Sequence, residues 1–382
     1  MKKKQTVLQI FAGVIFIALV ISSCSRINKV KDLVINPSAR EIYSREFKEN
    51  PQQYAIWEKQ AENALFDSLA VNLPYAENGI FTPGSFPIYA YDIALNPGER
   101  INVDIDTDSA QTRVFIDLYE QQDDSLKTFK HLKSADLEAS ALAEEITQPG
   151  IYKIVIQPEI NANTPFDLQL YREPVYKFPV AAKKSKNIQS FWGAVRDGGR
   201  RSHEGVDIFA PRGTPVIAAT SGRVTRTGNR GLGGKQVWLR DGKRGNSLYY
   251  AHLNSIIATS GQRVSPGDTL GLVGNTGNAR TTPPHLHFGI YKGYRGAVDP
   301  FNYIAETEPP VTRDVSAEKF SEFLVVTGAR ANLRGGPSTN FPVLGQLQAQ
   351  DTLQFLGKAK DWYHIRTNQK RSFIHESLVS PI

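Results

Sequence analysis

The sequence predicts a mainly β, multidomain protein, because two features recur along most of its 382 residues. Apolar residues alternate with polar ones over short runs, as at Ile101, Val103 and Ile105, and this period of two is typical of half-buried strands. Thirty glycines and 22 prolines separate the runs as turn residues do. The length allows roughly two to four domains, and with 40% hydrophobic residues the chain can build several small cores.

The net charge of the chain gives only a weak indication of the class of partner that it binds. The net charge of +7 is a modest excess of basic residues spread along the sequence. Such an excess favours an anionic polymer or a membrane surface, although solvated surface charge is its commonest meaning. We expect no nucleic-acid partner, since neither a basic helix nor an RNA-binding aromatic signature is present.

The first 23 residues have the features of a targeting segment. Lys2-Lys3-Lys4 precedes an apolar stretch, Ile10 to Ile21, that is too short for a comfortable membrane span. Small residues then lead to Cys24, the only cysteine, in a pattern that resembles the bacterial lipoprotein signal. The alternative is an ordinary buried thiol, but that does not explain why the cysteine directly follows an apolar stretch near the start of the chain. The resemblance implies cleavage before Cys24, its lipidation, and an anchor outside the cytoplasmic membrane, in the outer membrane if the cell is diderm.

Residues 24–78 are expected to be helical. Asn50-Pro51 is typical of an N-cap followed by proline at the first helical position. We expect a spacer or brace that packs on the next domain, with a partner-binding helix as the alternative. Apolar residues recur at spacings of three and four along one helical stripe, at Tyr54, Trp57, Ala61, Leu65 and Leu69.

Residues 79–173 change to a period of two and predict a small β-sandwich. Asp104, Asp106 and Asp108 also alternate, but Ser109 stands where a calcium loop needs glycine, so we expect a solvated strand face. The alternating runs are Ile101/Val103/Ile105, Val114/Ile116/Leu118 and Phe166/Leu168/Leu170, with turns at Pro97-Gly98 and Pro149-Gly150.

Four of the seven histidines fall between residues 203 and 287, beside one aspartate. His285 and His287 are two apart and therefore share a face of a strand. His203 and Asp207 are four apart, and the intervening Gly205 favours a bent strand over a helix. Two imidazoles and one carboxylate suit Zn²⁺ and leave a fourth position for water.

Each pair alone has a simpler explanation, because strands also carry histidines for packing or solvent contact. The metal interpretation depends on both pairs occurring within one β segment rich in glycine and proline. Four histidines exceed what three protein ligands require. The surplus can act as acids or bases near neutral pH.

An ordered set of segments carries a resemblance to a known family. The segments are residues 198–216, Gly222-Arg223-Val224, Tyr250-Ala251-His252-Leu253, residues 264–271, Gly274-Asn275-Thr276-Gly277 and His285-Leu286-His287-Phe288. With them, the stretch from Phe178 to Tyr303 closely resembles the lysostaphin/LytM-type zinc metallopeptidases, which cut the cross-link peptides of peptidoglycan. The resemblance covers about a third of the chain.

This resemblance implies a zinc-dependent endopeptidase of peptidoglycan stem and cross-link peptides, with an antiparallel β core over residues 174–305. One departure is Gly289, which stands where the family often has an acidic residue. The implied site has one Zn²⁺ held by three residues and two catalytic histidines in the cleft: His203, Asp207 and His287 as ligands, and His252 and His285 as catalytic residues.

Two other functions remain open at this point. Degenerate members of the family activate amidases without hydrolysis, but they usually lack ligand positions, and all five positions are intact here. The chain could also be mainly a wall-binding scaffold lipoprotein. Such a role is compatible with hydrolysis.

Three local features near the histidines carry further expectations. Residues 174–190 contain a lysine-rich stretch and are expected to begin the unit with a linker. The glycine-rich stretch 228–234 is expected to form a cleft wall rather than a phosphate loop, since no Gly-Lys-Ser/Thr follows it. Arg196, Arg200 and Arg201 precede the first metal ligand. They are near enough to meet substrate carboxylates, but solvated arginines are the simpler expectation.

The C-terminal part of the sequence predicts a linker followed by a small barrel. Residues 306–320 include Pro309-Pro310 and little periodicity, which predicts a linker. His364 alternates with its neighbours and is expected at the barrel surface. Residues 321–382 resemble a bacterial SH3-like domain, a small barrel that often binds cell-wall peptides, through residues 331–339, Val343-Leu344-Gly345, residues 361–366 and Phe373-Ile374.

Overall fold

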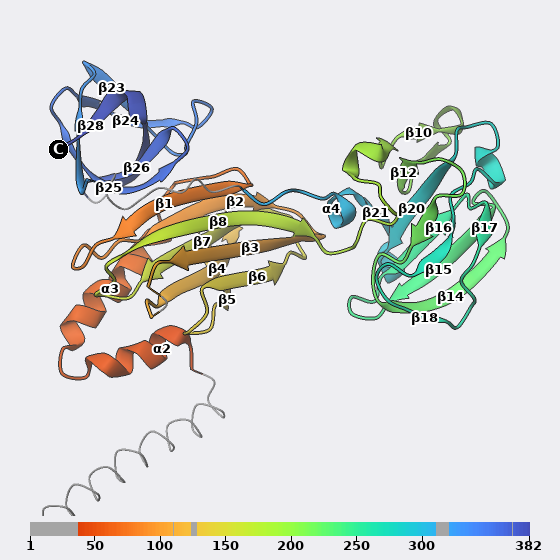
Figure 1. The fold of residues 1–382 in the computed structure, drawn as a ribbon, viewed down its shortest axis with the longest axis horizontal. Helices are drawn as coiled ribbons and strands as arrows, with labels where there is room; N and C mark the ends of the chain where they lie inside the picture. Colours follow the sequence, from red (N-terminus) through yellow and green to blue (C-terminus); the bar gives the residue numbers. More distant parts are fainter. Residues whose placement is uncertain (1–36, 110, 124–127, 311–320, 369) are drawn as a thin grey trace, which may run out of the picture.

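A computed structural model describes residues 37–109, 111–123, 128–310, 321–368 and 370–382. The expected signal segment, Cys24 and residues 311–320 of the expected linker lie outside the described residues. Strands dominate the fold, and the helices are few and short (Figure 1). No helix in the described ranges is long and apolar enough to cross a membrane. The domain boundaries that we set from the sequence stay predictions.

Two helices, α2 (Ala39–Ser44) and α3 (Pro51–Ala64), open the described chain. α3 begins with proline in its first turn, as the sequence predicted. The Trp57 side chain is fully buried, and its indole Nε1 donates to the Pro158 carbonyl oxygen at 2.8 Å, so the helix packs on the following domain. The expectation of helix throughout residues 24–78 is wrong beyond Ala64. Leu69 lies past the helix and joins the core of the sandwich instead.

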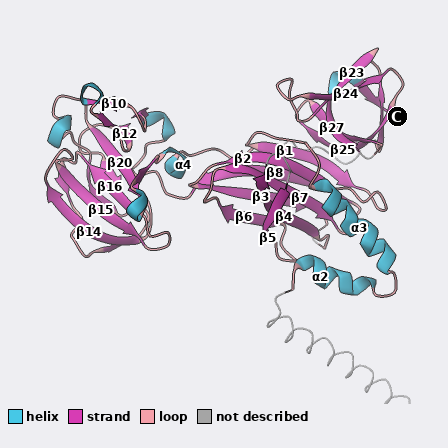
Figure 2. Cartoon of the chain, turned by 180° about the vertical axis from the view of Figure 1, so that it is seen from behind, coloured by secondary structure: helices cyan, strands magenta, loops and turns pink. Residues whose placement is uncertain are grey.

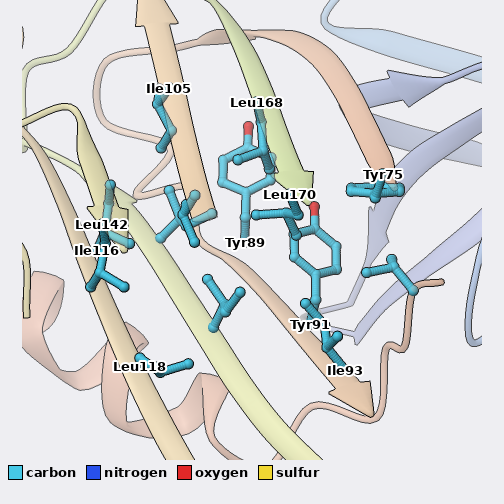
Figure 3. Close-up of a cluster of buried hydrophobic side chains, with 14 of the residues drawn as sticks. Tyr75, Tyr89, Tyr91, Ile93, Ile105, Ile116, Leu118, Leu142, Leu168 and Leu170 are labelled. Carbon is cyan, nitrogen blue, oxygen red and sulfur yellow. The ribbon is translucent and has the colours of Figure 1, made fainter. Parts of the chain in front are cut away.

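Eight antiparallel strands build the sandwich that was expected from the sequence. One sheet has the order β1-β8-β3-β6 and the other β2-β7-β4-β5. Their inner faces meet in one apolar core, to which Ile105 and Leu168 contribute from the first sheet and Ile116 from the second (Figure 3). The strands are β1 (Tyr75–Phe81), β2 (Tyr89–Leu95), β3 (Glu99–Thr107), β4 (Val114–Asp123), β5 (Thr128–Ser134), β6 (Ala141–Glu145), β7 (Gly150–Pro158) and β8 (Thr164–Pro174).

The unit that carries the histidines is an antiparallel β fold. Its main sheet has the order β18-β14-β15-β16-β20-β12-β9, with β21 paired to β20, and a small sheet has the order β13-β19-β17. The strands are β9 (Ile188–Ser190), β10 (Val195–Arg196), β11 (Arg201–Ser202), β12 (Val206–Phe209), β13 (Pro215–Ile217), β14 (Gly222–Asn229), β15 (Lys235–Asp241), β16 (Ser247–Ala251), β17 (Ser255–Ile256), β18 (Arg263–Val264), β19 (Thr269–Leu272), β20 (His285–Tyr291) and β21 (Ala297–Val298), followed by α4 (Phe301–Ile304).

The expectation of a linker over residues 174–190 is wrong. Tyr176, Phe178 and Val180 are all buried in the core of this unit, beside the strand residues Val206 and Phe288. The lysine-rich part of the segment, residues 183–186, follows these alternating apolar residues, so its linker-like composition does not extend to them. The segment is therefore part of the core and connects it directly to the end of β8.

The C-terminal barrel contains β22 (Phe323–Val326), β23 (Arg330–Arg334), β24 (Val343–Gln348), β25 (Thr352–Ala359), β26 (Trp362–Thr367), β27 (Lys370–His375) and β28 (Val379–Pro381). Strand β25 pairs with β1 of the sandwich, at Asn78 with Lys358 and Gly79 with Gly357. One sheet of 11 strands therefore runs from the sandwich into the barrel (Figures 1 and 2). Phe373 of the barrel belongs to the same apolar core as the sandwich residues.

His364 was expected at the barrel surface, and that expectation is wrong. Its side chain is 0% exposed, and its Nδ1 lies 2.9 Å from Oε1 of Glu77, which is equally buried. The hydroxyls of Tyr75 and Tyr91 donate to the same carboxylate. Alternation does place His364 on the outer face of β26, but the sandwich covers that face and excludes water from it.

Candidate metal centre

Strand pairing brings the sequence-predicted site residues to one place. β12 and β20 are antiparallel neighbours, with Asp207 opposite His287 and Phe209 opposite His285. β16 lies on the other side of β20, with Ala251 opposite His287, so His252 leaves the end of β16 beside the same histidine. Two positions of β20 and residues from its neighbours β12 and β16 therefore converge on one face of the sheet.

Three donor atoms form a compact group at this face. His203 Nε2, Asp207 Oδ1 and His287 Nδ1 lie 3.0 Å from one another in all three pairs. Atoms that bind one zinc ion at its usual bond lengths are separated by about 3.3 Å in tetrahedral geometry. The spacing and the chemistry of the donor set thus fit one small cation.

The hydrogen bonding of His203 supports the same conclusion. Its Nδ1 lies 2.9 Å from the Phe191 carbonyl oxygen, which can only accept, so Nδ1 carries the proton. In the neutral imidazole, Nε2 then presents a lone pair toward the carboxylate of Asp207 at 3.0 Å. Two acceptors in contact repel unless a proton or a cation lies between them. A metal ion would satisfy both, and a backbone carbonyl is a usual partner for the second nitrogen of a metal-binding histidine.

His252 and His285 flank this group and are oriented in the same way. Nδ1 of His252 lies 2.9 Å from the Thr276 carbonyl oxygen, and Nδ1 of His285 lies 2.9 Å from the Pro283 carbonyl oxygen. Each ring therefore keeps its Nε2 lone pair for the cleft. The two ring centroids are 5.1 Å apart, and His285 Nε2 is 3.9 Å from Asp207 Oδ1.

The backbone of His252 is strained. Its φ is 62°, in the left-handed region that residues other than glycine seldom adopt. Hydrogen bonds hold it there, because its N–H donates to the Gly233 carbonyl at 2.8 Å while its ring is tied to Thr276. The strain directs the imidazole into the cleft instead of along β16.

Burial sets the protonation of the site. Burial, together with repulsion from His287 and His285, lowers the pKa of His252 to about 4, so its imidazole is neutral at pH 7. Burial also lowers the pKa of His287. Burial alone would raise the pKa of Asp207, but its contacts with His203 and His287 outweigh that effect and hold the pKa well below its usual range. The lowered pKa values favour a carboxylate at Asp207 and neutral imidazoles at His252 and His287, and the ionised carboxylate and the neutral imidazole are the forms that bind metals.

Arg196 is a site residue whose contact the sequence did not indicate. Its Nη2 donates to Asp207 Oδ2 at 3.1 Å and to the Ser190 hydroxyl at 2.5 Å, and its side chain is half-buried. The expectation of a solvated arginine is wrong here. Eleven residues separate Arg196 from Asp207, and only the fold of the β10–β11 hairpin brings them together. Arg196 holds one carboxylate oxygen and leaves the other for the donor group.

A cleft of about 1030 Å³ contains the whole group. Gly231, Leu232 and Gly233 of the glycine-rich stretch line it, as expected of a cleft wall. Trp238 and Tyr249 line another part and lie with ring centroids 4.4 Å apart. The cleft is large enough to take several residues of an extended chain.

Two parts of the chain match known families. Residues 201–300 match Peptidase family M23, and residues 329–380 match the Bacterial SH3 domain. Residues 201–300 are an M23 peptidase domain. All five of the predicted site residues fall within this stretch.

The relatives of the M23 domain include named peptidoglycan endopeptidases. The L-Ala--D-Glu endopeptidase of Bacillus subtilis (strain 168) is 40% identical over 125 residues, which is 31% of this chain and 38% of that protein. The peptidoglycan DD-endopeptidase ShyA of Vibrio cholerae serotype O1 is 41% identical over 88 residues, 23% of this chain and 20% of its own length. The chain thus spans less than half the length of these relatives.

A solved structure is also similar to part of this chain. The catalytic domain of the antimicrobial peptidase lysostaphin from Staphylococcus simulans is 31% identical, with a TM-score of 0.28. The match covers 31% of this chain and 93% of that domain.

Proposed function

We propose that this protein is a zinc-dependent endopeptidase that hydrolyses peptide cross-links of bacterial peptidoglycan. One observation carries the proposal: His203, Asp207 and His287 place three donor atoms 3.0 Å apart within one cleft. The membership of residues 201–300 in the M23 family and the relatives named as peptidoglycan endopeptidases support the substrate class.

His203, Asp207 and His287 would hold the metal. A bound Zn²⁺ supplies two kinds of chemistry, since it lowers the pKa of a coordinated water and polarises a carbonyl group. The chain supplies the proton transfer. The Nδ1 contacts of His252 and His285 leave Nε2 of each ring directed into the cleft, and in a neutral ring this nitrogen can accept a proton from water.

The imidazolium formed in this way can donate a proton to the leaving amine. It also stabilises negative charge that develops on the substrate carbonyl oxygen. The low pKa of His252 keeps this ring ready to accept, and its strained backbone keeps it in place. The five predicted site side chains converge in one cleft. Neither a non-catalytic activator nor a pure scaffold requires such a convergence, so it argues against both alternatives.

Digestion of purified peptidoglycan sacculi tests this proposal. We expect the purified full-length protein to release soluble muropeptides, and a chelator to abolish the release until zinc is restored. Mass analysis of the products identifies the bond that is cut. Intact sacculi after incubation with zinc-loaded protein would refute the proposal, whereas products bearing new sugar ends would show a glycosidase.

We further propose that Cys24 anchors the protein to a membrane of the cell envelope. The support is the sequence of residues 1–24, in which a basic start and an apolar stretch precede the cysteine. We expect Cys24→Ser to prevent lipid attachment and to move the protein from the membrane fraction to the soluble fraction. Incorporation of a labelled fatty acid measures the attachment, and labelling of the variant equal to that of the wild type would refute the anchor.

A further inference from the structure

We propose that Arg196 is a positioning residue that restrains Asp207 to bind the metal through one oxygen, and thereby keeps a coordination position open for water. The inference rests on the proposed function, because it concerns the metal and the water of the same site. It goes further in giving a part in the reaction to a residue that is neither a metal ligand nor a proposed acid or base.

The two oxygens of the Asp207 carboxylate have different partners. Oδ1 lies 3.0 Å from His203 Nε2 and 3.0 Å from His287 Nδ1, within the donor group. Oδ2 accepts a hydrogen bond of 3.1 Å from Nη2 of Arg196. A guanidinium group stays charged at any pH of interest, and its bond to a carboxylate is stronger than that of a neutral donor. One oxygen is therefore held by a cation of the chain while the other remains for the metal.

Ser190 gives Arg196 a second anchor. Nη2 of Arg196 also donates to the Ser190 Oγ, at 2.5 Å, and this nitrogen carries two hydrogens, one for each acceptor. Ser190 on β9 is the strand partner of Asp207 on β12, so the hydroxyl and the carboxylate lie on adjacent strands at the same level. The position of the guanidinium group therefore depends on the pairing of the sheet as well as on the ion pair.

The β10–β11 hairpin fixes the direction from which Arg196 approaches. At its tip, Gly198 and Gly199 have φ values of 65° and 95°, in the left-handed region that glycine adopts without strain. At its base, the His203 N–H donates to the Ala194 carbonyl oxygen at 2.9 Å. The same hairpin thus orients the first metal ligand and carries the residue that restrains the second.

The coordination chemistry of zinc explains why this restraint matters. A carboxylate can bind a metal through one or both of its oxygens. A catalytic zinc site has three protein ligands and leaves a position for water or substrate. If Asp207 contributed both oxygens, the second would compete with water for that position. Arg196 opposes this, because Oδ2 would first have to give up its charge-assisted hydrogen bond.

Replacement of Arg196 by methionine tests the inference. Methionine is a long side chain without a donor, so Arg196→Met frees Oδ2 for the metal. We expect the zinc-loaded full-length variant to keep its full zinc content. On a purified cross-linked muropeptide dimer, its kcat should fall by roughly 10- to 100-fold with little change in KM, the usual size of the effect of a residue that supports a ligand.

Two further variants serve as comparisons. Arg196→Lys restores a charged donor without the guanidinium fork, so it should recover part of the lost kcat. Arg263→Met is the matched control and should behave as the wild type, since Arg263 is exposed on β18 outside the cleft lining.

Crystal structures of the zinc-loaded proteins give a readout that needs no activity. We expect the wild type to show only Oδ1 of Asp207 at a bonding distance of about 2.0–2.2 Å from the metal, and Arg196→Met to show both oxygens bonded. If Arg196→Met unfolds, as judged by its thermal midpoint, Ser190→Ala removes the second anchor alone. A lowered kcat at full zinc content in that variant supports the inference, and an unchanged kcat overturns it.

The outcomes separate this inference from the proposed function. Asp207 bound through one oxygen in both proteins, or through both oxygens in the wild type, overturns the inference and leaves zinc-dependent hydrolysis intact. Loss of zinc from Arg196→Met also overturns it, since a freed oxygen should add to the ligands. A raised KM at unchanged kcat overturns it in favour of an arginine that binds substrate. If the wild type cleaves neither the dimer nor sacculi, the proposed function fails, and the two crystal structures still decide the inference.

Discussion

At the scale of single residues, backbone carbonyls decide what the histidines can do. Phe191, Thr276 and Pro283 each accept from an Nδ1, so that His203, His252 and His285 all present Nε2 to the cleft. The same three contacts fix the tautomer and the ring orientation. Equal hydrogen bonding does not mean equal roles, because only His203 lies within 3.0 Å of both Asp207 and His287.

The first prediction concerns the ligand group. His203→Ala removes one of three donor atoms, so we expect zinc affinity to fall by at least the roughly 10- to 100-fold that loss of a supporting partner causes. Zinc content after dialysis against a weak chelator measures this. His131→Ala is the control, since His131 is an exposed histidine of the sandwich, and it should keep full zinc content. Equal zinc in both variants would remove His203 from the metal site.

The second prediction separates catalysis from metal binding. His252→Ala leaves the three donor atoms in place but removes a neutral Nε2 from the cleft. We expect unchanged zinc content and a fall in kcat of about 10²- to 10⁴-fold, the usual contribution of a general acid or base. Muropeptide release and metal analysis on the same sample measure both. Undiminished turnover would show that His252 has no part in the reaction.

At the scale of elements, two strands meet more closely than side chains allow. β1 and β25 pair at Gly79 and Gly357, and a Cβ on Gly79 would lie 2.5 Å from the Leu356 carbonyl oxygen. A Cβ on Gly357 would meet the buried Glu77 carboxylate. Glycine at both positions is therefore what lets the barrel continue the sheet of the sandwich.

The third prediction tests this contact. Gly79→Ala forces the strands apart or displaces Leu356, so we expect the free energy of unfolding to fall by about 1–3 kcal/mol, as for overpacking of a core. Chemical denaturation with tryptophan fluorescence measures it. The control is Gly345→Ala on β24, where a Cβ meets no atom within 4 Å. A Gly79→Ala protein as stable as this control would mean that the barrel is only loosely associated.

At the scale of the whole molecule, the sandwich lies between the barrel and the M23 domain (Figures 1 and 2). On the barrel side, the contact is a shared sheet and core. On the M23 side, it includes an ion cluster in which Glu145 of β6 accepts from Arg100, Lys243 and Arg244. Burial would raise the pKa of Glu145, but these hydrogen bonds lower it to about 2.

The fourth prediction follows from that shift. The folded pKa lies below the value of about 4.5 in the unfolded chain, so Glu145 stabilises the fold above pH 4.5 and loses this effect as pH falls toward 2. We expect Glu145→Gln to lower the thermal midpoint at pH 7 by roughly 2–4 °C. The difference from wild type should shrink between pH 4.5 and 2. Scanning calorimetry measures it, with the exposed Glu308→Gln as the unaffected control.

Local patterns in the sequence were sufficient to predict much of the fold and of the candidate site. Alternation predicted the sandwich, and Asn50-Pro51 predicted a helix start. The resemblance to the lysostaphin/LytM-type metallopeptidases singled out the same five residues that converge in the cleft. These features depend on side chains close in sequence or on segments whose order is shared with relatives. Strand periodicity and turn chemistry act over a few residues and are therefore visible without the fold.

Contacts between distant segments were decided only by the tertiary structure. His364 looked like a surface residue because alternation tells which face of a strand a side chain is on, but not what covers that face. Arg196 looked solvated because nothing in its neighbourhood indicates a partner eleven residues away. Tyr176 and Phe178 looked like linker residues because only packing shows that they complete a core. In each case the partner is a separate element, and its position depends on how whole sheets and hairpins pack.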